Sequence, residues 1–228
     1  MKAKLVIAFI IIVLLTTGFF GLDYYILAQN RYYDISLSLD RWIPLSPVWI
    51  WAYLLYYPFC LVPFLFPTVL NDTRLFVRIA AGFLIQFIVA WPIFYFFPTR
   101  IIHPVLTGTT FSVLAVQGLY RVDAGCCILP CLHVANSLYT GLVLRRFLSP
   151  RWSVPIFFVV GLISASTLLI KQHLVVDVLA GVLLGFAAYA FYLSTARLWV
   201  AAWDEGSSSE VPQRLNPVFR EPALRASE

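Results

Sequence analysis

LFVRIAAGFLIQFIVAWPIFYFF, residues 75–97, is the stretch that decides what kind of fold this chain can form. Arg78 is its single charged residue and lies close to one end. The hydrocarbon core of a bilayer is about 30 Å thick, and a helix of about 20 apolar residues crosses it. A run of this length and composition therefore predicts a helix that spans a membrane.

Similar apolar runs lie on both sides of this stretch, and we predict six spans in all. Their ranges are 5–22, 48–66, 75–97, 132–148, 154–170 and 174–200. Pro58 and Pro63 interrupt the second run. Since proline removes a helical hydrogen bond and clashes with the preceding turn, this span should be kinked or broken.

The composition of the whole chain agrees with an integral membrane protein. Hydrophobic residues make up 61% of the 228 residues and charged residues 12%, against about 45–50% and about 25% in soluble domains. The mean hydropathy is +0.85. These values exclude a soluble globular domain, a disordered chain and a small disulfide scaffold. The net charge of +5 comes from basic residues that form no dense run, so nucleic acid is not an expected partner.

The basic residues predict how the chain is oriented. Six spans place both termini on one side, and cytoplasmic loops of membrane proteins are rich in Lys and Arg. With the N-terminus inside, most of the 16 basic residues fall in cytoplasmic segments, so we predict an N-in, C-in bundle. Residues 1–203 form the membrane domain in this interpretation. Residues 204–228 change to Gly, Ser, Pro and mixed charges, and predict a flexible cytoplasmic tail.

The chain has three histidines, His103, His133 and His173, and this orientation puts them all at the outer face. His173 and Asp177 are four residues apart, a spacing that places two side chains on one helix face. A carboxylate in an apolar span is costly unless it is paired or meets water. A histidine held by a carboxylate keeps one ring nitrogen free as a base or nucleophile. A packing hydrogen bond without chemistry is the alternative.

Three stretches resemble the type 2 phosphatidic acid phosphatase (PAP2) superfamily. STLLIKQHLVVD, residues 166–177, resembles its third motif, S-R-x5-H-x3-D, and PCLH, residues 130–133, resembles its second, P-S-x-H. FPTRIIHP, residues 97–104, stands where the family has its first, basic motif. The resemblance covers about residues 95–185. The six predicted spans and the outward-facing motifs match the family's usual layout.

The resemblance implies a membrane lipid-phosphate phosphatase that works without metal or cofactor through a phospho-histidine. His173 would attack phosphorus and Asp177 would orient it, while His133 would protonate the leaving alkoxide and then activate water. The side chains expected to bind the substrate phosphate are Arg100, Lys171, His103, Cys131 and Arg121. Arg121 can instead pair with Asp123 in its own loop.

Three features depart from the family pattern. The first motif lacks its leading lysine, and His103-Pro104 replaces its Arg-Pro, which leaves Arg100 as its cation. Thr167 replaces the arginine of the third motif, and Cys131 replaces the serine of the second. A third motif without the arginine also occurs in the inositol-phosphorylceramide-synthase-like branch, which transfers a phosphoryl headgroup to a lipid alcohol. Two alternatives therefore stay open: a phosphotransferase acting on a lipid or sugar alcohol, and a degenerate member that only binds a lipid phosphate.

Soft metal ligands also cluster in this region. Cys126, Cys127, Cys131 and His133 lie within eight residues, but structural zinc usually takes two separated ligand pairs, so we predict no metal.

The expected partners are a lipid phosphate and membrane lipids, and a homodimer is left open. We expect a multi-pass protein of a bacterial inner membrane or its equivalent, with an extracytoplasmic site. Phosphatidic acid, phosphatidylglycerol phosphate, polyprenyl diphosphate and lipid A phosphates would all suit such a site.

Overall fold

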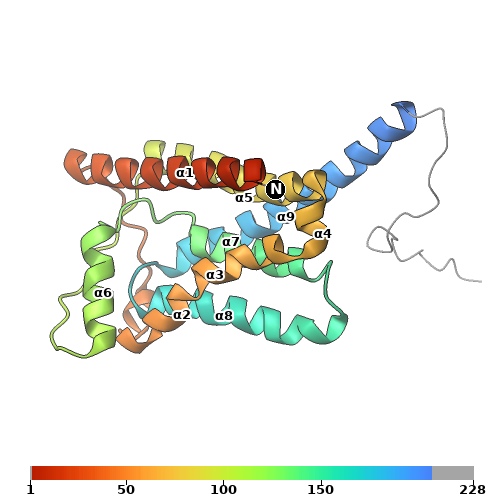
Figure 1. Ribbon diagram of the computed structural model, residues 1–228. Helices are drawn as coiled ribbons and strands as arrows, with labels where there is room; N and C mark the ends of the chain where they lie inside the picture. The colour runs from red at the N-terminus through yellow and green to blue at the C-terminus, as the bar shows by residue number, and fades with distance from the viewer. Residues whose placement is uncertain (1, 207–228) are drawn as a thin grey trace, which may run out of the picture.

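The computed structural model describes residues 2–206, and this part of the chain is all-helical, as predicted. The longer helices form a bundle (Figure 1). They are α1 (Lys2–Gln29), α5 (Thr73–Phe96), α7 (Leu132–Leu144), α8 (Ser153–Leu169) and α9 (Val175–Gly206). The shorter helices are α2 (Ile50–Leu54), α3 (Tyr56–Leu61), α4 (Pro67–Asn71) and α6 (Phe111–Val122). The described residues contain no strand, only an isolated bridge between Tyr33 and Thr99.

Four helical segments of the described residues are long and apolar enough to cross a membrane. They are Pro47–Leu65, Thr73–Phe96, Pro150–Leu169 and Val175–Thr195, and each overlaps a predicted span. The predicted span at 5–22 falls in α1, whose side chains are described only in part. The predicted span at 132–148 corresponds to α7, whose 13 residues are fewer than the about 20 that cross a bilayer core.

The predicted tail at 204–228 lies mostly outside the described residues. Helix α9 continues to Gly206, two residues past the predicted start of the tail. Residues 207–228 are not described. The division of the chain at residue 203 therefore stays a prediction.

The segment from 47 to 65 is broken, as its prolines predicted. Pro58 has no N–H to bond to the carbonyl of Leu54, and α2 ends at Leu54. Pro63 likewise cannot donate to Phe59, and α3 gives way to the tighter turn η3 (Val62–Leu65). Tyr53 and Tyr56 of this segment pack against His133 on α7.

Helix α7 lies in the middle of the bundle and packs against α5, α8 and α9 (Figure 1). Gly181 and Gly185, one turn apart on α9, allow the backbone of α9 to approach that of α7 closely. A Cβ on Gly181 would lie 2.5 Å from the carbonyl oxygen of Cys131, and one on Gly185 would lie 2.8 Å from that of Ala135. Small residues spaced by four are a common means of bringing two membrane helices into backbone contact. The first turns of α7 and α9 are thereby held side by side.

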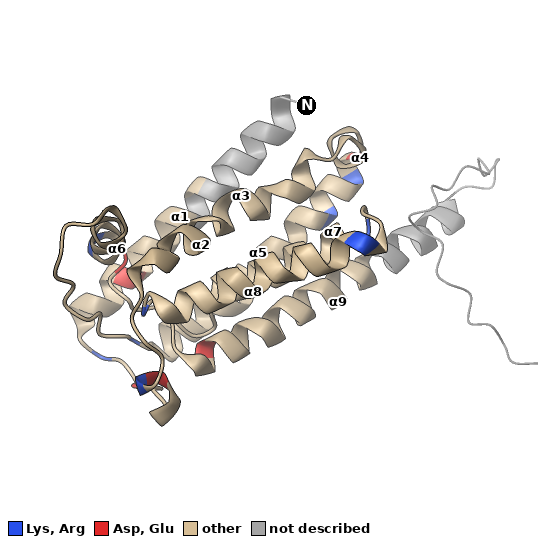
Figure 2. Cartoon of the chain, turned by 90° about the horizontal axis from the view of Figure 1, so that it is seen from below, with Lys and Arg blue, Asp and Glu red and all other residues tan. Residues whose placement is uncertain are grey.

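Helix α6 was not predicted from the sequence, which we interpreted as loop between the third and fourth spans. Its first turn is capped by Thr110, whose hydroxyl accepts from the amide of Val113 at 3.4 Å. It stands at one end of the bundle, across the direction of α8 (Figure 1). In the part of the chain that Figure 2 colours, charged residues lie toward the two ends of the bundle and the middle is without them.

Candidate active site

Segments that are far apart in the sequence meet at the end of the bundle where α6 lies. The amide of Tyr33, after α1, donates to the carbonyl of Pro98, after α5, at 2.8 Å. The amide of Ser46, before α2, donates to the carbonyl of Leu169, at the end of α8, at 2.8 Å. All three histidines lie on these connecting segments or in the first turn of the helix that follows. The geometry therefore brings the predicted site residues to one end of the bundle.

The turn between α8 and α9 fixes the backbone around His173. Lys171 adopts a left-handed conformation, with φ of 53°. The amides of Gln172 and His173 both bond back to the carbonyl of Thr167, at 2.9 and 3.1 Å, and close the end of α8. His173 therefore precedes α9 rather than lying inside it, contrary to the single helix face that its spacing predicted.

Asp177 holds the His173 ring from the first turn of α9. One carboxylate oxygen accepts from the amide of Leu174 at 2.6 Å, and the other lies 2.7 Å from Nδ1 of His173. The side chain of His173 is 7% exposed and that of Asp177 is fully buried. In a neutral imidazole the carboxylate keeps the proton on Nδ1, so Nε2 carries a free lone pair.

His133 faces that lone pair from the first turn of α7. Its Nδ1 lies 3.4 Å from Nε2 of His173, and its ring is half-buried. The rings of Tyr53 and Tyr56 pack against it, with centroids 4.6 and 4.5 Å away. The hydroxyl of Tyr56 is fixed by the amide of Asn136, which donates to it at 2.8 Å. These aromatic neighbours orient the imidazole, and no pattern in the sequence marked them as part of the site.

Arg100, His103 and Arg121 line one pocket of about 350 Å³, together with Tyr24 and Tyr120. The ring of His103 stacks flat on Tyr120, with centroids 3.9 Å apart. Within residues 2–206, the buried Nε of Arg100 and Nε2 of His103 have no hydrogen-bond partner. Unpartnered buried donors next to a pocket can bind an oxyanion without breaking existing bonds. The geometry thus joins three of the five predicted phosphate-binding residues.

The pKa of His103 is lowered, chiefly because burial disfavours the imidazolium. Asp123 opposes this shift, while the nearby charges of His173 and Arg100 add to it. His103 therefore lies near enough to His173 and Arg100 for their charges to lower its pKa. A neutral His103 can donate one ring proton to a phosphate oxygen.

Lys171, another predicted phosphate-binding residue, is occupied by the backbone. Its ammonium donates to the carbonyls of Asp40, at 2.9 Å, and of Ile43. Asp40 in turn accepts from the amide of Val175 at 2.9 Å, at the beginning of α9. In this structure Lys171 fastens the segment after α1 to the turn that carries His173. Asp40 belongs to this arrangement and was missed, because no spacing in the sequence relates it to residue 171.

Asp23 is a second buried acidic residue whose contacts no sequence pattern predicted. It lies just past the predicted span 5–22 and is fully buried. Its carboxylate accepts from the amides of Ala124 and Cys126, at 2.8 and 2.9 Å, and so fixes the loop that leads into α7. Burial is the main cause that raises the pKa of Asp23 to about 6, and Asp123 adds to it.

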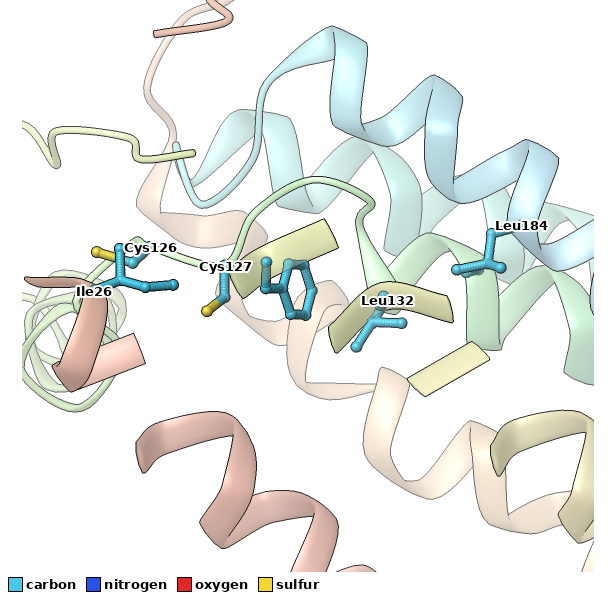
Figure 3. Close-up of a cluster of buried hydrophobic side chains, with 8 residues drawn as sticks. Ile26, Cys126, Cys127, Leu132 and Leu184 are labelled. Carbon is cyan, nitrogen blue, oxygen red and sulfur yellow. The ribbon is translucent and has the colours of Figure 1, made fainter. Parts of the chain in front are cut away.

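The cysteines, all of which lie in the described part of the chain, are free thiols in three separate environments, and Cys60 is half-buried on α3. Cys126 and Cys127 pack in a hydrophobic cluster with Ile26, Leu132 and Leu184 (Figure 3). Cys131 is fully buried and stands apart from that cluster. Its sulfur lies within 4.8 Å of a ring nitrogen of His133 and of His173. The four adjacent soft ligands considered in the sequence are therefore not brought to one point.

The arrangement as a whole offers a histidine with a free lone pair, a second histidine in contact with it, and a pocket with cationic and hydrogen-bonding groups. No known family, no curated protein and no solved structure matches this chain.

Proposed function

We propose that the protein is a membrane lipid-phosphate phosphatase that forms a phospho-histidine on His173. The observation that carries the proposal is the contact chain Asp177–His173–His133, with distances of 2.7 and 3.4 Å. This chain supplies a nucleophile, the carboxylate that orients it and an acid–base group, which together are the requirements of covalent phosphoryl transfer. The resemblance to the PAP2 superfamily, the six spans and the N-in, C-in orientation are parts of the same proposal.

In the first step, Nε2 of His173 attacks the phosphorus of the substrate. A nitrogen–phosphorus bond forms, the bond to the alkoxide breaks, and His133 gives its proton to the departing oxygen. Asp177 stabilises the positive charge that develops on the His173 ring. In the second step His133 takes a proton from water, the hydroxide attacks phosphorus, and phosphate leaves Nε2.

Charge on the phosphoryl oxygens must be neutralised, since phosphoryl transfer depends mostly on positioning and electrostatics. Arg100, His103 and Arg121 supply cationic and donating groups from the pocket. Helix α7 adds backbone donors, because its N-cap residue Cys131, in the described structure, makes no side-chain bond to the first turn. In this proposal the lipid tails remain in the bilayer and the phosphate enters from the extracytoplasmic side.

The test is phosphate release by the detergent-purified protein from a panel of lipid mono- and diphosphates, with EDTA present. We expect His173→Ala to lower the rate by more than about 10³-fold, as removal of a covalent nucleophile does in other enzymes. Ser166→Ala is the matched control. Ser166 is buried on α8 and its hydroxyl bonds only within its own helix in the described contacts, to the carbonyl of Ile163.

The result that contradicts the phosphatase is equal activity in both variants. Release that appears only when a lipid or sugar alcohol is added, with a new phosphorylated product, identifies the phosphotransferase instead. Binding of lipid phosphate without turnover under either condition identifies the degenerate, non-catalytic member.

A further inference from the structure

We propose that Cys131, His133 and His173 form a zinc-binding site. The sulfur of Cys131 and one ring nitrogen from each histidine lie within 4.8 Å of one another. One sulfur and two imidazole nitrogens are the ligand types that zinc prefers. The residues come from the beginning of α7 and from the turn before α9, so the fold rather than a sequence motif brings them together.

The spacing fits tetrahedral coordination. With metal–nitrogen bonds of about 2.0–2.1 Å and a metal–sulfur bond of about 2.3 Å, ligand atoms lie about 3.3–3.6 Å apart. Nε2 of His173 and Nδ1 of His133 are already 3.4 Å apart. The sulfur lies within 4.8 Å of both nitrogens, so each sulfur–nitrogen distance must shorten by at most about 1.2–1.5 Å to complete the triangle. Rotation about the side-chain bonds of Cys131 can supply that movement.

Asp177 completes the surroundings that metal-bound histidines usually have. A histidine that binds zinc through one nitrogen commonly donates the proton of the other to a carboxylate. His173 does so already through Nδ1, at 2.7 Å from Asp177, which leaves Nε2 for the metal. Tyr53 and Tyr56 pack against the ring of His133, which is half-buried, and in this proposal water fills the fourth position of the metal.

The charges balance when zinc binds. Cys131 loses its thiol proton to solvent and forms a sulfur–zinc bond, so the thiolate and the Asp177 carboxylate together neutralise the divalent ion. His133 shifts its ring proton from Nδ1 to Nε2 without releasing it. Zinc binding should therefore release one proton from Cys131 for each metal bound at neutral pH.

Occupation of this site would inhibit the enzyme, a consequence that rests on the proposed function. The lone pair of Nε2 on His173 cannot hold zinc and attack phosphorus at once. Zinc would thus keep the enzyme inactive until the metal is removed.

The experiment measures metal binding directly, on full-length protein in detergent after EDTA treatment and removal of the chelator. Cobalt(II) is titrated first, because thiolate coordination gives a near-ultraviolet charge-transfer band, and zinc is then used to displace it. We expect one metal per chain. We expect Cys131→Ser to abolish the band and weaken zinc binding by more than about 100-fold, since loss of an outer-shell partner alone costs about 10–100-fold.

Cys60→Ser is the matched control, because Cys60 is a half-buried free thiol outside the ligand set. We expect it to keep the band and the affinity. His133→Ala, which keeps the thiol, should also lose tight binding, and size-exclusion elution verifies that each variant is folded. Any of three results overturns the proposal: the wild type shows no band, Cys131→Ser retains the band, or folded Cys60→Ser loses it. Zinc binding by a protein whose metal-free form, assayed with EDTA, releases no phosphate from any lipid supports the metal site and refutes the phosphatase.

Discussion

At the scale of single residues, the two carboxylate oxygens of Asp177 have different partners: one binds a backbone amide and the other binds the ring of His173. One oxygen accepts from the Leu174 amide at the beginning of α9, in the manner of the third residue of a capping box. The other oxygen sets which nitrogen of His173 bears the proton. A substitution that replaces only the second oxygen therefore keeps the structural contact with Leu174 and removes the proposed catalytic contact with His173.

We expect Asp177→Asn to fold and to lose activity. The amide oxygen can still accept from Leu174, whereas the amide nitrogen donates to Nδ1 of His173 and moves the ring proton to Nε2. The lone pair needed for attack is then lost, and the rate should fall by about 10⁴-fold, as when a tautomer-fixing carboxylate is amidated elsewhere. The measurement is initial-rate phosphate release with the best lipid substrate.

Asp72→Asn is the control for this prediction. Asp72 accepts from the amides of Arg74 and Leu75 at the beginning of α5, and asparagine is an equally good N-cap. It should keep near-normal activity. Full activity in Asp177→Asn would show that His173 needs no fixed tautomer and would contradict the proposed mechanism.

The sequence predicted part of this residue-scale detail. A spacing of four suggested that His173 and Asp177 meet, and they lie 2.7 Å apart. No spacing indicated that Asp23 would bind the loop before α7, or that Lys171 would bind the carbonyl of Asp40. Those contacts join segments about 100 or more residues apart, and only the packed fold determines them.

At the scale of helices, the site depends on how closely α9 approaches α7. Gly181 sets that distance next to the site, since an added Cβ would meet the carbonyl oxygen of Cys131 at 2.5 Å. Backbone cannot move aside as a flexible side chain can. Overpacking of this kind typically costs about 1–3 kcal/mol.

We expect Gly181→Ala to lower the free energy of unfolding by about this amount and to reduce phosphate release, because α9 must shift away from α7. Thermal unfolding in detergent and the activity assay measure the two effects. Gly161→Ala on α8 is the control, since a Cβ there meets nothing within 4 Å. Equal stability of the two variants would mean that the close approach is not needed.

The sequence predicted the helices that are long apolar runs, and it did not predict a helix whose formation depends on packing. The runs predicted the segments Thr73–Phe96 and Val175–Thr195, and Pro58 and Pro63 predicted the interruption before Leu65. Helix α6 was interpreted as loop, because its 12 residues mix polar and apolar types. The sequence shows the glycine pair on α9, but it does not indicate that α7 is the helix against which these glycines pack.

At the scale of the whole molecule, charge lies at the two ends of the described bundle, and the orientation in the membrane follows from which end is cytoplasmic (Figure 2). We predict that the end with the histidines faces outward. Asp34→Cys, at an exposed position after α1, should react with a membrane-impermeant maleimide on intact cells. Ser149→Cys, exposed between α7 and α8, should react only after permeabilisation.

The native thiols favour this measurement, because Cys126, Cys127 and Cys131 are buried and Cys60 is half-buried. The unsubstituted protein measures the remaining background. Labelling of Ser149→Cys but not Asp34→Cys on intact cells would reverse the predicted orientation.

The order in which the site residues leave the ribosome has a consequence for biosynthesis. His133 and the Arg100 pocket belong to the earlier part of the chain, whereas His173 and Asp177 come at the beginning of α9, the last described helix. A nascent chain that stops before residue 173 can carry the pocket but no nucleophile. Under the proposed mechanism, prematurely terminated chains are harmless to the lipids around them, and catalytic power arises only when synthesis of the membrane domain is nearly complete.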